Sequence, residues 1–142
     1  MTSGGSPLVL VVEDDLETRR FYSEVLVRNG FQVDQAHNGH QALEKAFATN
    51  PALVITDIAV PGMDGIELCQ RLRADARTSD IPVLAVTGYE DRQYPDRAIQ
   101  AGADYVLIKP CDAELILSEV RRLLEHGRAN GSHVSHSDLI TP

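Results

Sequence analysis

The sequence predicts an α/β fold: a doubly wound, five-stranded parallel sheet with five helices, arranged as a three-layer sandwich. Short apolar runs rich in β-branched residues alternate with segments whose apolar residues recur at helical spacing. The connections between these segments are short, which implies right-handed crossovers between neighbouring parallel strands. The chain has 142 residues, 43% of them apolar, and this suffices for the core of one domain.

Five strands are expected. The first, from Leu8 to Val12, is rich in β-branched residues and ends at three consecutive acids, which suits a strand buried on both faces. The remaining strands are predicted at residues 31–36, 52–57, 81–87 and 105–108.

Five helices are predicted after these strands. The first ends at Asn29-Gly30 and the second at Asn50-Pro51, because both pairs are typical of helix ends. Asp64 is an expected N-cap of the third helix, and a short fourth helix ends at Ala101-Gly102. Asp112 opens the last helix, whose apolar residues share one face.

The charge balance excludes two classes of partner. Lys and Arg number 13 against 21 Asp and Glu, a formal net charge of −8, which argues against a surface for phosphate backbones or anionic lipids. No apolar run approaches the ~20 residues needed to cross a bilayer. The N-terminus also lacks the basic start and apolar stretch of a secretory signal. We therefore expect a cytoplasmic protein that binds neither nucleic acid nor membrane.

The two ends of the chain lack periodicity. We expect residues 1–6 and 127–142 to be disordered on either side of a domain at residues 7–126, because the tail is polar and rich in turn formers. For that reason three histidines in or beside the tail are not interpreted as metal ligands: His126, His133 and His136.

Two cysteines form no disulfide framework. Cys69 falls on the apolar face of the third predicted helix and is expected in the core. Cys111 follows Pro110 close to the end of the last strand, and a structural role is expected for it as well.

In open parallel sheets, functional sites lie beyond the carboxyl ends of the strands. Polar residues follow the predicted strands at these ends. Acids Glu13 and Asp14 follow the first strand, Asp57 ends the third, Thr87 the fourth, and Lys109 follows the fifth. Converging carboxylates repel one another unless a cation compensates, and Mg²⁺ suits oxygen ligands. A carboxylate nucleophile, a lysine, a hydroxyl and a metal are the parts of phosphoryl transfer, which points to an aspartyl phosphate. Asp15, by contrast, is expected to cap the first helix.

Four motifs in this order carry a family resemblance. They are Val11 to Asp15, Asp57 to Gly65, Val86-Thr87-Gly88, and Ala101 to Asp104 leading to Lys109-Pro110. Over roughly residues 7–126 the chain resembles the receiver domain of bacterial two-component response regulators, in particular single-domain regulators of the chemotaxis type. The resemblance implies a flavodoxin-like fold.

The resemblance also assigns the acids. It implies that Asp57 is the phosphoacceptor and that Asp14 binds Mg²⁺ directly, while Glu13 acts largely through water. The backbone carbonyl of Ala59, two residues past the phosphoacceptor, would supply a further metal ligand. Ala59 stands where phosphohydrolases of the haloacid dehalogenase type have a second Asp as general acid, which argues against that class of enzyme.

Lysine and threonine have implied roles at the phosphoryl group. Lys109 would pair with the acids and then with the phosphoryl oxygens, and the bond to Pro110 is usually cis in the family. Thr87 would turn inward to hydrogen-bond the phosphoryl group, and this motion is the switch.

Three positions near the site depart from the family pattern or tune it. Val106 stands where the family usually has Tyr or Phe, and Tyr105, one residue away on a strand, is expected on the opposite face. We therefore expect a muted or differently propagated output change. Gly88 replaces a common Ala and is expected to widen access, whereas Tyr89 is expected to shield the phosphoryl group and slow its loss.

The implied function is a phosphoacceptor. A sensor histidine kinase or histidine phosphotransfer protein would phosphorylate Asp57 with Mg²⁺, and a monomer or weak dimer would signal through protein contacts. The protein would lose the phosphoryl group slowly and would not be a multiple-turnover enzyme. No DNA-binding output domain is expected, because the tail is too short for a core. Two alternatives stay open: a receiver cut from a hybrid kinase or larger regulator, and an adaptor that works without phosphorylation.

Overall fold

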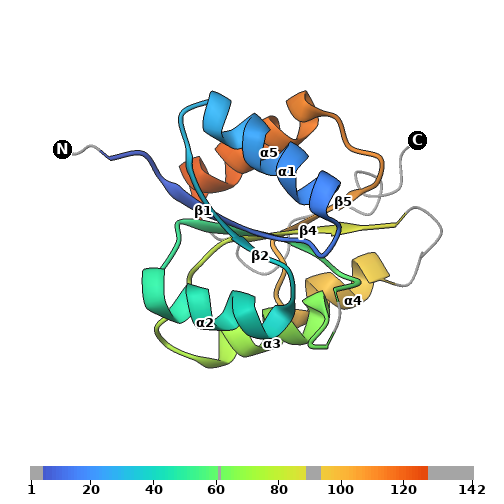
Figure 1. Cartoon of the computed structure of the whole chain (residues 1–142). Coiled ribbons are helices and arrows are strands. Elements are labelled where there is room, and N and C mark those ends of the chain that lie inside the picture. The colour runs from blue at the N-terminus through green and yellow to red at the C-terminus, as the bar shows by residue number, and fades with distance from the viewer. Residues whose placement is uncertain (1–4, 61, 89–93, 128–142) are drawn as a thin grey trace.

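A computed structural model describes residues 5–60, 62–88 and 94–127 (Figure 1). Its five strands form one parallel sheet in the order β2-β1-β3-β4-β5. The winding direction therefore reverses between β1 and β3, which is the arrangement of a doubly wound sheet. The strands are β1 (Leu8–Val12), β2 (Gln32–Ala36), β3 (Leu53–Asp57), β4 (Val83–Thr87) and β5 (Tyr105–Ile108).

Helices cover both faces of the sheet. Figure 1 shows α1 and α5 together on one face and α2, α3 and α4 on the other, so the predicted three-layer sandwich is confirmed. The helices are α1 (Leu16–Arg28), α2 (Gly39–Thr49), α3 (Gly65–Ala74), α4 (Tyr94–Ala101) and α5 (Ala113–His126). Among the residues that the structure describes, no helix is long and apolar enough to cross a membrane.

The sheet separates two apolar cores. Successive residues of a strand alternate between them, with Val9 in the core under α1 and α5 and Leu10 in the core under α2, α3 and α4. The same alternation places Val106 in the second of these cores, 1% exposed, and Tyr105 against the first. The prediction that Tyr105 faces away from Val106 is thus confirmed. Cys69 is buried in the core, also as predicted.

Side chains of Asp or Asn cap four of the helices. The carboxylates of Asp15, Asp64 and Asp112 accept backbone N–H groups at the starts of α1, α3 and α5, as the sequence predicted. Asn38 does the same for α2. Gly127 ends α5, with a positive φ of 72° and an N–H that donates to the Leu123 carbonyl. The predicted disorder at residues 1–4 and 128–142 lies outside the described residues.

Three strands begin later than predicted. Strand β4 starts at Val83, not at residue 81, because the Ile81 N–H donates to Thr78 and Pro82 has no N–H. Strand β2 starts at Gln32, because the Phe31 N–H is used by the carbonyl of Leu26 at the end of α1. Strand β3 starts at residue 53, one position after the predicted start.

A buried ion pair ties α3 to the start of β5. The guanidinium of Arg73 donates to Asp104 Oδ2 at 2.9 Å, and this carboxylate also accepts the Val83 N–H at 2.8 Å. The Asp104 side chain is fully buried. Arg73 donates further to the carbonyls of Gly102 and Ile81. A Cβ at Gly102, whose φ is +118°, would lie 2.6 Å from Arg73 Cγ, so the close approach needs glycine there.

Candidate functional site

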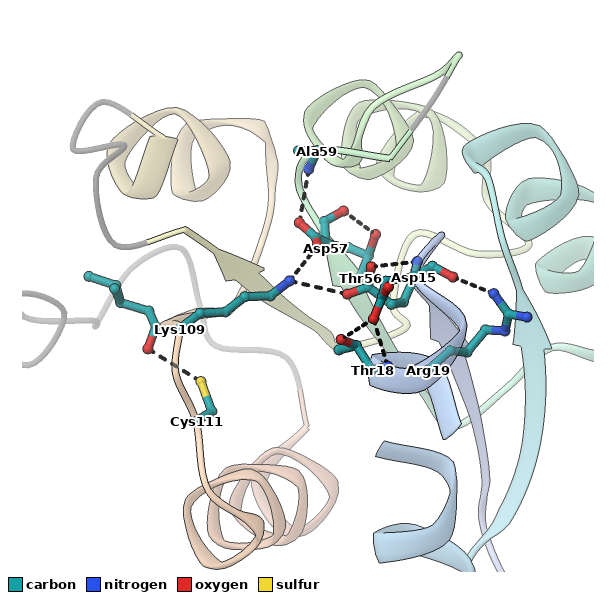
Figure 2. A network of polar contacts seen from close by, with 10 residues as sticks. Asp15, Thr18, Arg19, Thr56, Asp57, Ala59, Lys109 and Cys111 are labelled. Atoms are coloured by element: carbon teal, nitrogen blue, oxygen red, sulfur yellow. Dashed lines mark hydrogen bonds and ion pairs between the residues drawn. The ribbon is translucent and has the colours of Figure 1, made fainter. Parts of the chain in front are cut away.

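The site lies at the carboxyl edge of the sheet. Because all five strands are parallel, Glu13 after β1, Asp57 at the end of β3, Thr87 at the end of β4 and Lys109 after β5 emerge at this one edge. Figure 2 shows Asp57 and Lys109 pointing toward each other across this edge. The predicted gathering of strand-end residues is therefore found in the structure.

Lys109 joins two carboxylates. Its Nζ lies 2.7 Å from Asp57 Oδ2 and 3.2 Å from Glu13 Oε1 (Figure 2). Partial burial works against the charge of Lys109, but hydrogen bonds and ion pairs with Asp57 and Glu13 outweigh it and raise the pKa of the ammonium. These contacts hold the lysine as a cation between the ends of β1 and β3. The peptide bond that follows it, Lys109-Pro110, is cis.

Asp57 is held at both oxygens. Its Oδ2 accepts from Lys109, and its Oδ1 accepts the backbone N–H of Ala59 at 3.0 Å. The hydroxyl of Thr56 donates to the carbonyl of Asp57 at 2.9 Å, as Figure 2 shows. A Cβ on Gly65 would lie 2.7 Å from that carbonyl oxygen, so only glycine lets the start of α3 pack this closely. The side chain of Asp57 is consequently oriented and 9% exposed.

Glu13 is a buried acid. Burial raises its pKa to about 7, and the hydrogen bond from the Asp15 N–H opposes this rise. The neighbouring Asp57 carboxylate raises the pKa further, while Lys109 lowers it. The Glu13 backbone is held as well, since Arg19 donates to its carbonyl oxygen at 2.8 Å. The site thus brings two carboxylates, Glu13 and Asp57, to one lysine.

The other predicted site residues take different positions. Thr87 is 2% exposed at the end of β4, and no described residue hydrogen-bonds its hydroxyl. Asp14 and Ala59 are exposed. Ala59 contacts Asp57 through its N–H, whereas the predicted metal ligand is its carbonyl. Tyr89 lies outside the described residues, so its predicted shielding role stays a prediction.

The donor set fits a hard divalent cation in its chemistry. Two carboxylates and a backbone carbonyl are oxygen ligands of the kind Mg²⁺ takes. Burial and, to a smaller extent, the neighbouring Asp57 carboxylate raise the pKa of Glu13, and a further cation beside it would favour its charged form. Within the described ranges, no three His, Cys, Asp or Glu side chains already converge as metal ligands do. Lys109 Nζ instead contacts both Glu13 and Asp57.

Sequence reasoning missed two residues that support the site. Arg19 reaches back from α1 to Glu13 and also donates to Gln35 on β2 at 3.0 Å. A basic residue one turn after the N-cap of α1 was the available signal. Thr56 was visible only as a polar residue inside an apolar strand, and its hydroxyl could not be assigned to the Asp57 carbonyl from sequence.

Comparisons with known proteins agree with this geometry. Residues 9–121 match the family model of the response regulator receiver domain. The chain is 36% identical over 134 residues to the "DNA-binding dual master transcriptional regulator RpaA" of Synechocystis, covering 94% of this chain and 56% of that protein. It is 31% identical to "Histidine kinase P4" of Formosa agariphila, covering 94% of this chain and 10% of that protein.

Solved structures of response regulators share this fold. A putative response regulator from Chloroflexus aurantiacus superposes with a TM-score of 0.82 at 30% identity, covering 85% of this chain and 99% of that one. The chemotaxis response regulator CheY4 of Vibrio cholerae superposes with a TM-score of 0.78 at 28% identity, covering 83% and 98%. The chain spans little more than half of the first regulator it matches and a tenth of the kinase. With the strand order, the Lys109–Asp57 pair and the match over residues 9–121, the chain belongs to the receiver domain family of two-component response regulators.

Proposed function

We propose that Asp57 accepts a phosphoryl group and that its phosphorylation carries the signal. One observation carries the proposal: the Asp57 carboxylate is held between the Lys109 ammonium and the Ala59 N–H at the carboxyl end of β3. Such a carboxylate is oriented and lies close to a cation that neutralises transferred charge. Receiver domains are signalling modules, and phosphorylation and Mg²⁺ are typical of the family.

The proposed reaction is the transfer of a phosphoryl group to the Asp57 carboxylate. A carboxylate oxygen of Asp57 attacks the phosphorus of a phosphohistidine or an acyl phosphate. The new O–P bond forms as the donor's P–N or P–O bond breaks, and the imidazole or carboxylate leaves with the bonding electrons. Lys109 neutralises one phosphoryl oxygen, and the Thr87 hydroxyl, which no described residue hydrogen-bonds, is available to donate to another.

Mg²⁺ would be held by Glu13 through water, by Asp14 and Asp57, and by the Ala59 carbonyl. When bound, the metal supplies neutralisation of the charge that develops on the phosphoryl oxygens. The chain's own acids orient it, and Arg19 contributes by holding the Glu13 backbone in place. The exposed Ala59 offers no general acid, so hydrolysis of the phosphorylated form is proposed to be slow.

Intact-mass measurement after incubation with acetyl phosphate tests the proposal. The wild type should gain one phosphoryl mass with Mg²⁺ and none with excess EDTA, and Asp57→Asn should gain none. Asp64→Asn is the matched control, since it lies in the same connection and Asn preserves the helix cap; it should be phosphorylated like the wild type. A wild type that gains no mass from any phosphoryl donor would overturn the proposal and favour an adaptor that works without phosphorylation.

The proposed function also implies a class of phosphoryl donor and a kind of downstream target. A histidine kinase or a histidine phosphotransfer protein would supply the phosphoryl group, and the phosphorylated monomer or weak dimer would act by contacting another protein. The matches to a kinase and to longer regulators support a second candidate, a receiver that works inside a larger protein. The mass of the polypeptide isolated from its native host distinguishes the two.

A further inference from the structure

The peptide group that joins Asp57 to Ile58 is held at both ends. Its N–H, which belongs to Ile58, donates to the carbonyl of Val86 on β4 at 3.0 Å. Its carbonyl, which belongs to Asp57, accepts the hydroxyl of Thr56 at 2.9 Å (Figure 2). The orientation of this peptide group is therefore fixed by one contact between strands and by one side-chain hydroxyl.

The next peptide group, between Ile58 and Ala59, follows from that orientation. Its carbonyl accepts the Gly65 N–H at 2.8 Å, and its N–H donates to Asp57 Oδ1 at 3.0 Å. Ala59 thus orients the Asp57 carboxylate through its N–H, while its own carbonyl is the proposed metal ligand. Because peptide groups are planar, a rotation of the first one would change the path of the chain at Ile58 and displace both polar groups of Ala59.

Thr56 is the one polar residue in the apolar run that precedes Asp57. It is fully buried, and its neighbours across the sheet are Val12 of β1 and Ala85 of β4. Valine has nearly the same shape as threonine and would fill this place without the cost of burying a hydroxyl. The hydroxyl therefore calls for a role of its own, and its hydrogen bond to the Asp57 carbonyl supplies one.

The start of α3 covers the Asp57 carbonyl. A Cβ on Gly65 would lie 2.7 Å from this oxygen and 2.8 Å from Ile58 Cα, and Asp57 itself is buried. A carbonyl covered in this way would be left without a donor if the Thr56 hydroxyl were removed. A buried acceptor without a donor costs free energy, so the peptide group would turn away from its present orientation.

We propose that Thr56 is a positioning residue for phosphoryl transfer. Its hydroxyl fixes the peptide group after Asp57 and thereby sets the two polar groups of Ala59, one that orients the phosphoacceptor carboxylate and one that would bind Mg²⁺. Thr56 acts through the backbone, since its hydroxyl is bonded to the carbonyl of Asp57 and not to the carboxylate. This role rests on the proposed function, because it assigns a part in the reaction at Asp57.

Three variants separate the hydroxyl from the rest of the side chain. Thr56→Val keeps the volume and removes the hydroxyl, whereas Thr56→Ser keeps the hydroxyl. Thr78→Val is the matched control, because Thr78 is also fully buried and donates its hydroxyl to a backbone carbonyl, that of Leu72 at 2.7 Å, near the far end of α3. Urea unfolding shows whether each variant folds. If Thr56→Val does not, Thr56→Ala takes its place, since it differs from Thr56→Ser only in the hydroxyl.

Amide hydrogen exchange in excess EDTA tests the backbone in the absence of metal and phosphoryl group. Thr56→Val should speed exchange of the Ile58 and Ala59 amides about fivefold, the effect of one lost hydrogen bond. Thr56→Ser and Thr78→Val should exchange like the wild type at both positions. Unchanged exchange of these two amides in Thr56→Val, or an equal increase in Thr78→Val, would overturn the proposal.

The rate of phosphorylation by acetyl phosphate tests the reaction itself. At saturating Mg²⁺, Thr56→Val should lower the maximal rate about tenfold and leave the half-saturating concentration of acetyl phosphate unchanged, because the hydroxyl orients the nucleophile and not the donor. Thr56→Ser should restore most of the rate, and Thr78→Val should react like the wild type. A loss that Thr56→Ser does not restore would mean that the hydroxyl is not the cause.

The two measurements distinguish the role of Thr56 from the proposed function. If the wild type is phosphorylated and Thr56→Val reacts at the same rate, the positioning role is refuted and the proposed function stands. If the wild type gains no phosphoryl group from any donor, the proposed function fails. Exchange of the Ile58 and Ala59 amides then decides by itself whether the hydroxyl orders this part of the backbone.

Discussion

Replacing Glu13 by Gln changes how the free energy of unfolding depends on pH. In the metal-free wild type, burial holds the pKa of Glu13 at about 7, against 4.5 in an unfolded chain. The folded state thus binds this proton more tightly than the unfolded state, and stability falls as the pH rises from about 4.5 to 7. Gln cannot ionise, so Glu13→Gln should escape this loss.

The size of the effect follows from the same shift. Each pKa unit corresponds to about 1.4 kcal/mol, so the cost of the Glu13 charge approaches roughly 3 kcal/mol above pH 7. Between about pH 5 and pH 8 the stability of Glu13→Gln relative to the wild type should therefore grow by about 2 to 3 kcal/mol. The contact with Lys109 is lost at both ends of this range and does not alter the difference between them.

Urea unfolding followed by circular dichroism measures the difference. Wild type, Glu13→Gln and the exposed-residue control Glu24→Gln are compared across this pH range in excess EDTA and again in saturating Mg²⁺. In EDTA only Glu13→Gln should diverge from the wild type as the pH rises. In Mg²⁺ the divergence should shrink, because the added cation neutralises the carboxylate. A stability difference that stays constant with pH in EDTA would refute the reasoning.

Three further predictions concern the acids and one glycine. Asp14→Asn should abolish Mg²⁺ binding measured by calorimetry, whereas Asp15→Asn, which keeps a capping side chain, should retain it; equal affinities would remove Asp14 from the metal site. Asp104→Ala removes the carboxylate that pairs with the largely buried Arg73 guanidinium and should cost about 3 to 5 kcal/mol in urea unfolding. The partly exposed Asp75→Ala, which loses an ion pair with Arg77, should cost much less. Similar midpoints for the two variants would contradict this. Gly65→Ala forces a Cβ toward the Asp57 carbonyl and should slow phosphorylation by acetyl phosphate more than tenfold, and an unchanged rate would show that the close contact can relax.

Much of this fold was predictable from local pattern. The alternation of β-branched runs with helical spacing predicted five strands and five helices, and capping residues such as Asp64 and Asp112 located helix starts. The first residues of the strands were less predictable, because they depend on which backbone N–H groups are already hydrogen-bonded within neighbouring turns. The Ile81 N–H is used by Thr78, and no feature of residues 81–82 alone reveals that bond.

The sequence by itself determined which residues meet at the functional edge. In a parallel sheet every strand ends on the same side, so the position of Glu13, Asp57, Thr87 and Lys109 directly after apolar runs was enough to bring them together. The same period-two alternation placed Val106 and Tyr105 on opposite faces. These inferences needed only connectivity and period, which are properties of the chain itself.

Only the tertiary structure decided the pKa values of the site residues and the hydrogen-bond partners of buried polar groups. That Lys109 contacts both Glu13 and Asp57, and that Glu13 is buried deeply enough to hold a proton near neutral pH, depends on distances between strands far apart in sequence. The surroundings of the Tyr22 hydroxyl are of the same kind: the sequence places this tyrosine on an apolar helical stripe, and only the structure shows that no described residue hydrogen-bonds its hydroxyl. Desolvation and hydrogen-bond partnership are set by the surrounding atoms, and only the folded chain supplies those.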